Sequence, residues 1–109
     1  VKAVKATGRK QLVIAGIVTE VCVAFPALSA LNEGFEVFVV VDASGTFNKT
    51  TRNAAIARMQ QAGAQMITWF AMASELQRDW RDNGDGLKKI YCDHLLEYDA
   101  LVVAHDAEK

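Results

Sequence analysis

The chain has 109 residues, of which 51% are hydrophobic and 23% charged, and its formal net charge at pH 7 is -1. This length is typical of one domain, and the composition is typical of a soluble globular protein and not of a disordered chain. The near-neutral charge gives no electrostatic reason to expect a nucleic acid or an anionic membrane as a partner. No apolar run is long enough to span a bilayer.

The two cysteines, Cys22 and Cys92, are too few for a disulfide framework. No export signal precedes the first apolar run, so we expect free thiols in a reducing compartment and a cytoplasmic protein. Cys92 and His94 are only two potential metal ligands, and the stretch Arg81–Gly86 lacks the acidic spacing of a calcium loop. We therefore expect no metal and no other cofactor, and an exposed turn at residues 81–86.

The chain begins with a segment that resembles the last turns of a helix. Val1 and Val4 lie on one helical face, and Gly8 is placed to end the helix. Three apolar, β-branched runs then predict strands buried on both faces. These strands are expected at Gln11–Ile17, Glu36–Val41 and Gln65–Trp69.

Helical segments alternate with these strands. The segment Glu20–Glu33 is apolar almost all round, which predicts a helix covered on more than one side, and Pro26 should bend it unless it falls in the first turn. Thr50–Ala62 predicts an amphipathic helix that ends at Gly63. A last helical face is expected to hold Trp69, Met72, Ala73, Leu76 and Trp80.

Strands that alternate with helices predict a parallel sheet with right-handed crossovers, which is an α/β fold of the doubly wound kind. Three strands make half of a usual sheet of this kind. We expect one domain over residues 1–86 and a C-terminal tail over 87–109 with a short helix, available for contacts in an oligomer.

Cys22 is the residue best placed for chemistry. It follows the first expected strand and falls in the first turn of the next helix, where unpaired N–H groups and the helix dipole favour a thiolate. Ligands of open α/β sheets bind at this end of the strands. The neighbouring Glu20 disfavours a second negative charge unless a cation offsets it. A cysteine in an apolar helix is also commonly a small buried hydrophobe, and His94 and His105 lie in the tail.

Three stretches resemble the nucleophile region of the isochorismatase-like hydrolases, a superfamily that includes nicotinamidases and N-carbamoyl amide hydrolases. They read G-I-V-T-E-V-C-V over residues 16–23, A-L-S-A-L-N-E-G over 27–34 and V-V-V-D-A-S over 39–44. The similarity extends through at least Trp80. The finer pattern, including T-E-V-C-V-A-F-P-A-L-S-A and D-A-S-G-T-F-N, is most similar to the YcaC-like branch.

The resemblance implies a role for Cys22 as the catalytic nucleophile, which attacks a carbonyl carbon and forms an acyl-enzyme. It also implies a cis peptide bond between Ile17 and Val18, and an oxyanion hole formed by the N–H groups of Val18 and Cys22. Members with isochorismatase activity lack this cysteine, so its presence favours hydrolysis of a small amide or related C–N bond.

The resemblance also implies that two catalytic groups of the family are absent from these residues. In the family an Asp serves as acid/base and a Lys or Arg activates the cysteine, and both lie upstream of the cysteine strand. Lys2, Lys5, Arg9 and Lys10 precede that strand too closely and lie at its other end. We expect the chain to represent the C-terminal half of a parallel three-layer (αβα) Rossmann-like isochorismatase-like hydrolase fold.

The prediction is therefore a cysteine hydrolase with a small-molecule substrate, no nucleic-acid or membrane partner, and a homo-oligomeric state. The alternative is a non-catalytic subunit that keeps the fold without the chemistry.

Overall fold

The computed structural model describes residues 2–108. The chain divides into two compact units, residues 1–72 and residues 73–109, each described below by itself. This division lies before the boundary expected at Gly86. Within the described residues, no helix is both long enough and apolar enough to cross a membrane.

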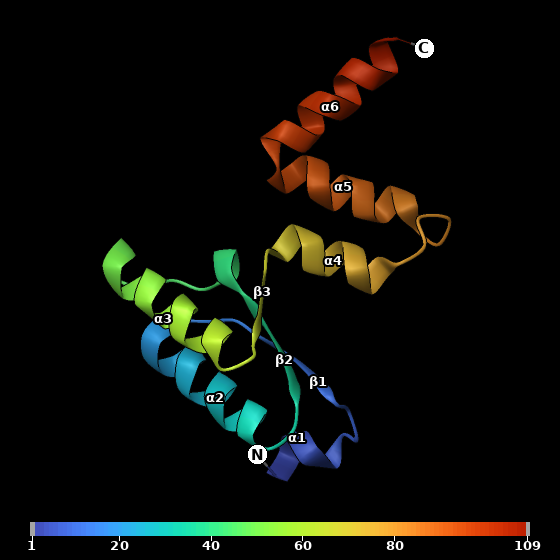
Figure 1. Ribbon diagram of the computed structural model, residues 1–109. Coiled ribbons are helices and arrows are strands. Elements are labelled where there is room, and N and C mark those ends of the chain that lie inside the picture. The colour runs from blue at the N-terminus through green and yellow to red at the C-terminus, as the bar shows by residue number, and fades with distance from the viewer. Residues whose placement is uncertain (1, 109) are drawn as a thin grey trace. The chain divides into compact units, whose positions relative to one another are not determined.

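The first unit is built on a parallel sheet of three strands in the order β1-β2-β3 (Figure 1). The strands are shorter than the apolar runs predicted, and they span Gln11–Ile14 (β1), Glu36–Val40 (β2) and Gln65–Ile67 (β3). Leu12 pairs with Val37, and Val39 pairs with both Ile14 and Met66. The predicted fold class, a parallel α/β sheet with intervening helices, is confirmed.

A short helix, α1 (Lys2–Ala6), precedes the sheet, and Gly8 follows it with a φ of 73°. The predicted helix end is present, although Val1 lies outside the described residues. Gly8 donates its N–H to the carbonyl of Lys5, which closes the last turn.

The connection from β1 to β2 is a helix in two parts. A π-helical turn, η1 (Thr19–Val23), leads into the α-helix α2 (Ala24–Asn32). Pro26 is the third residue of α2, just after the π-helical turn η1 ends at Val23. The single helix predicted over 20–33 is thus a wide turn followed by an α-helix, and Pro26 lies in the first turn of that helix.

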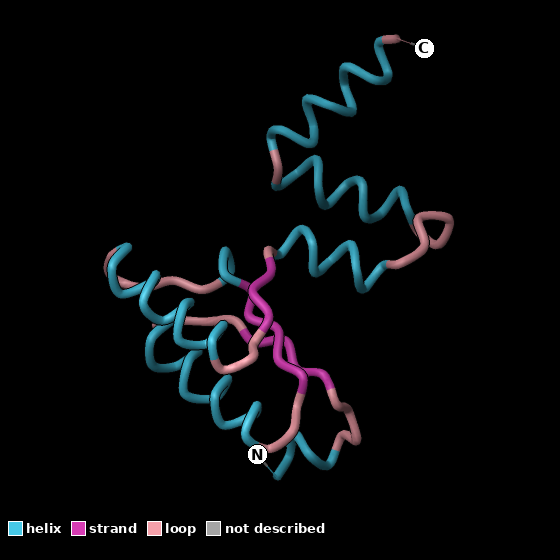
Figure 2. Tube along the Cα trace, in the orientation of Figure 1, coloured by secondary structure: helices cyan, strands magenta, loops and turns pink. Residues whose placement is uncertain are grey.

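A 3-10 turn, η2 (Val41–Ala43), and the helix α3 (Lys49–Gln61) connect β2 to β3. The helix begins at Asn48, whose side chain accepts hydrogen bonds from the N–H and the hydroxyl of Thr51. Helices α2 and α3 are in contact, and Figure 2 shows them side by side. Helix α2 contacts β2 and helix α3 contacts β3. The core contains Val23, Ala24, Ala27, Ala30, Val37, Val39, Ala55, Met59 and Ala64.

Strand β1 differs from its prediction. We expected it to be buried on both faces, but its residues alternate between exposed and partly buried, and Val13 is 49% exposed. Val21 and Phe25, on the following turn and helix, are also exposed. The reason is that β1 is an edge strand of the described sheet, and no described element covers its outer side.

Helix α4 (Trp69–Gln77) follows β3 directly. Asp42 accepts a hydrogen bond of 2.7 Å from the N–H of Trp69, which ties the start of α4 to the turn after β2. Met72 is buried, but the helix ends at Gln77, so Trp80 does not continue its face as predicted.

The second unit contains two further helices, α5 (Gly84–His94) and α6 (Leu96–Ala107). Tyr91 is fully buried there, and its hydroxyl lies 2.7 Å from that of Ser74. The exposed turn expected over residues 81–86 is present at residues 81–83 and ends there, because α5 begins at Gly84. The tail was expected to hold a short helix, and this expectation is wrong, because α6 continues almost to the end of the described chain.

Candidate active site

The turn that carries Cys22 lies at the carboxyl end of β1. Gly16 has a φ of 153°, a backbone conformation that favours glycine, and it redirects the chain after the strand. The peptide bond between Ile17 and Val18 is cis, which is the conformation that the family resemblance implies. Cys22 then lies in η1, and its side chain is exposed. An exposed thiol at this end of the sheet is accessible to a ligand.

The segment after β2 holds this turn in place. Gly45 donates its N–H to the carbonyl of Gly16 (3.1 Å), and its own carbonyl accepts from the N–H of Thr19 (3.0 Å). The Ser44 hydroxyl accepts from the N–H of Gly16 (3.3 Å) and donates to the carbonyl of Val40 (2.8 Å). The pattern of residues 42–46 did not predict this positioning role.

The backbone around Cys22 is already hydrogen-bonded. The carbonyl of Val18 accepts from the N–H groups of Val21 (3.2 Å), Cys22 (2.9 Å) and Val23 (3.3 Å), and this convergence produces the wide π-helical turn. An oxyanion that used the N–H of Cys22 would compete with the Val18 carbonyl for that donor. The assignment of Val18 and Cys22 to an oxyanion hole therefore stays a proposal.

Two polar side chains lie in the same turn. Glu20 is partly buried and accepts a hydrogen bond from the hydroxyl of Thr46. Thr19 is 2% exposed, and its hydroxyl has no hydrogen-bond partner among residues 2–108. A buried hydroxyl without a partner is unfavourable, so this atom marks a place where the described residues leave a polar group unsatisfied.

Cys22 lies on the wall of an apolar groove. The groove has a volume of about 610 Å³ and runs along the outer side of β1 and α2. Its lining is Val4, Leu12, Val13, Ile14, Cys22, Phe25, Pro26, Ser29, Ala30, Glu33 and Phe35. The groove gives the thiol an apolar wall, and Glu33 is the one charged residue of the lining.

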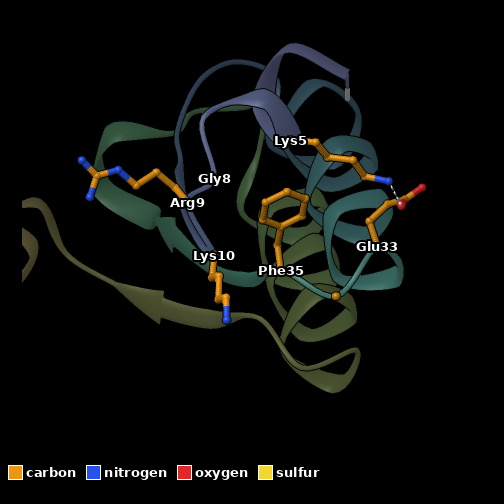
Figure 3. A pocket seen from close by; sticks show the side chains of 7 residues that line it. Lys5, Gly8, Arg9, Lys10, Glu33 and Phe35 are labelled. Atoms are coloured by element: carbon orange, nitrogen blue, oxygen red, sulfur yellow. Dashed lines mark hydrogen bonds and ion pairs between the residues drawn. The ribbon is translucent and has the colours of Figure 1, made fainter.

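The cations near the start of the chain lie elsewhere. Figure 3 shows Lys5, Arg9 and Lys10 around a second pocket, at the amino ends of β1 and β2. The ammonium group of Lys5 lies 2.5 Å from a carboxylate oxygen of Glu33, and this hydrogen bond lowers the pKa of Glu33. None of these cations lines the groove that holds Cys22.

Cys92, the other thiol, is in a different environment. It lies partly buried in α5, where desolvation and then a hydrogen bond to Asp99 raise the pKa of its thiol. His94 and His105 are exposed. Across the residues that the structure describes, no three or more His, Cys, Asp or Glu side chains are grouped to hold a metal ion.

The first unit thus combines a parallel α/β sheet with an exposed cysteine in the turn that follows its edge strand. The isochorismatase domain matches residues 1–70. The chain therefore belongs to the isochorismatase family of hydrolases.

Two YcaC proteins match nearly the whole of this chain. The probable hydrolase YcaC of Escherichia coli is 62% identical over 106 residues, which cover 97% of this chain and 51% of YcaC. Its crystal structure, that of an octameric hydrolase of unknown specificity, superposes with a TM-score of 0.90 at 61% identity and covers 99% of this chain and 53% of its own. The structure of YcaC from Pseudomonas aeruginosa with hexane-2,5-diol and covalent acrylamide superposes with a TM-score of 0.89 at 60% identity. The match covers 96% of this chain and 52% of that one.

A more distant relative matches a smaller share of the chain. The zinc complex of the pyrazinamidase of Pyrococcus horikoshii has a TM-score of 0.60 at 32% identity and covers 62% of this chain and 38% of its own. This chain spans about half the length of the YcaC proteins that it matches.

Proposed function

We propose that this chain carries the nucleophile of a cysteine hydrolase that cleaves a small amide or a related C–N bond through an acyl-enzyme. The observation that carries the proposal is the position of Cys22. It is exposed, lies in the turn after β1 at the carboxyl edge of the sheet, and faces an apolar groove. A thiol so placed can meet a small uncharged substrate.

The proposed reaction proceeds in two steps. The thiolate of Cys22 attacks the carbonyl carbon, forming an S–C bond and an oxyanion, and the C–N bond breaks as the leaving nitrogen takes a proton. Water then attacks the thioester, losing a proton to a base, and the acid product leaves with the thiol restored. The N–H groups of Val18 and Cys22 are the proposed donors to the oxyanion.

The proton transfers require groups that the described residues do not place beside Cys22. By resemblance to the family, an Asp acts as acid and base and a Lys or Arg stabilises the thiolate. We propose that the intact enzyme supplies both from the part of the domain that this chain does not cover. The orphaned hydroxyl of Thr19 and the uncovered side of β1 support such a completion.

We also propose that the enzyme is a homo-oligomer of the cytoplasm with residues 87–109 in its contacts, since its YcaC relative is octameric and both of its cysteines are free thiols. The second candidate function is a non-catalytic assembly subunit. The hydrogen bond from Cys22 N–H to the Val18 carbonyl favours it, because that donor is occupied in this structure.

A panel of small primary amides and N-carbamoyl compounds, incubated with the intact protein, tests the proposal. Ammonia release should fall to background in Cys22→Ser and should be unchanged in Cys92→Ser, the matched control. Equal turnover by the Cys22→Ser variant would exclude the nucleophile assignment. No turnover by the wild type on any member, with no acyl adduct on Cys22, would favour the assembly subunit.

A further inference from the structure

The outer face of α6 is unusual for a helix of a folded chain. None of the residues of α6 is buried. Its inner side packs on α5, where the Tyr98 ring meets Tyr91 edge-on at 5.2 Å and Val102 is partly buried. The opposite side nevertheless also carries apolar residues, which no described element covers.

These outer residues have the spacing of a helix–helix seam. Leu96, Ala100, Val103 and Ala107 are alternately four and three residues apart, so they form one line along the helix. All four are exposed, Leu96 by 84% and Val103 by 61%. We call this line the α6 stripe. Its alternation of large and small side chains allows another helix to approach closely.

We propose that the α6 stripe is an interface between two copies of this chain, with α6 of one copy antiparallel to α6 of the other about a two-fold axis. The inference rests on the homo-oligomer proposed above and names the surface that forms it. In the antiparallel arrangement Leu96 faces Ala107 of the second copy, and Ala100 faces its Val103. Each large side chain then meets a small one, so the stripe is complementary to itself, as a two-fold interface requires.

The comparisons favour a second copy as the occupant. The isochorismatase domain match ends at residue 70, and the pyrazinamidase structure covers 62% of the chain. The two YcaC structures cover 99% and 96% of it and therefore include α5 and α6. The helices of the second unit are therefore shared with the two YcaC structures, and one of these structures is an octamer.

The edges of the α6 stripe are acidic, with Glu97 on one side and Asp106 on the other. Two such helices repel each other electrostatically, and salt screens this repulsion. The contact should therefore persist or strengthen when the ionic strength is raised. A basic partner held by these carboxylates would dissociate under the same conditions, which distinguishes it from a second copy.

Glutamate substitution in the intact protein tests the interface. Val103→Glu places a charge at the centre of the α6 stripe, and Leu101→Glu, a matched control, places one at a 70% exposed position off the stripe. Light scattering after size exclusion should give Val103→Glu a molar mass at most half that of the wild type, and Leu101→Glu an unchanged mass. An unchanged mass for Val103→Glu would overturn the interface, and a monomeric wild type would instead overturn the proposed oligomer.

Cross-linking tests the same contact without a charge that could unfold the helix. Copies with Ala100→Cys and copies with Val103→Cys, both lacking Cys22 and Cys92 through serine substitutions, are co-expressed with tags of different size. Oxidation should link the two kinds of copy at least tenfold faster than it links copies with Leu101→Cys to either. Equal rates in all pairs would contradict the antiparallel register.

Discussion

The hydroxyl of Thr46 donates a hydrogen bond of 2.5 Å to a carboxylate oxygen of Glu20, two residues before Cys22. The bond joins the segment after β2 to the turn after β1, alongside the backbone hydrogen bonds of Gly45 with Gly16 and Thr19. It also gives the Glu20 carboxylate a donor of its own. A carboxylate held in this way is fixed in direction, so the position of Cys22 depends on a residue that is distant in sequence.

Loss of this bond should loosen the cysteine turn. In Thr46→Val, the free energy of unfolding of the intact protein should fall by about 1–2 kcal/mol, since the lost bond is to a charged group, and alkylation or turnover at Cys22 should fall several-fold. Denaturant titration and rate measurements check both. Thr50→Val, at an exposed position of α3, serves as the control and should leave both unchanged. An unchanged rate of alkylation or turnover at Cys22 in Thr46→Val would show that the turn keeps its conformation without this hydrogen bond.

The Thr19 hydroxyl gives a prediction of opposite sign. Because the atom is buried without a partner among residues 2–108, Thr19→Val should raise the free energy of unfolding of the 109-residue chain, in whatever assembly it forms, by about 1 kcal/mol. Thr51→Val is the matched control and should lower it, since that hydroxyl donates to Asn48. If Thr19→Val stabilises the isolated chain but destabilises the intact protein, the missing part of the domain supplies the acceptor.

The 109-residue chain alone should not behave as a monomer. The outer side of β1 presents unpaired backbone groups, and Val13 and Phe25 expose apolar surface along the groove. Sedimentation velocity should show dimers, larger species or aggregates. A single monomeric species with a cooperative melt would mean that the fold closes on itself.

The same isolated chain should have no amidase turnover. A nucleophile without its acid/base group and cation keeps only a small part of the catalytic effect of the assembled site. Turnover comparable to that of the intact protein, lost in Cys22→Ala, would show that partners for Cys22 lie within these residues.

Local pattern predicted the order of elements well. The β-branched run at Glu36–Val41 and the helix ending at Gly63 are short-range signals, and the strand and helix lie within one residue of their predictions. Predictions that depend on contacts outside the local sequence pattern were less accurate. Burial of β1 depends on what covers its edge, and the π-helical turn at Cys22 depends on three N–H groups that share the Val18 carbonyl.

The candidate site shows the same contrast between local sequence signals and contacts of residues that are distant in sequence. The sequence indicated Cys22 from its position after a strand, but the contacts of Ser44, Gly45 and Thr46 with that turn join residues 26 to 29 apart in sequence. The helices of the second unit were underestimated because residues 81–86 read R-D-N-G-D-G, which is typical of a turn. Its helices are stabilised by contacts of Tyr91 with Ser74 and Tyr98, which residue spacing alone does not predict.

The central claim is that Cys22 is a reactive nucleophile, and competitive alkylation of the intact protein tests it most directly. Cys22 is exposed at the start of a helix, whereas desolvation and Asp99 raise the pKa of Cys92, so less Cys92 thiolate is present at neutral pH. With iodoacetamide near pH 7, peptide mass spectrometry should find Cys22 modified at least tenfold faster than Cys92. Equal rates, or faster modification of Cys92, would contradict the account.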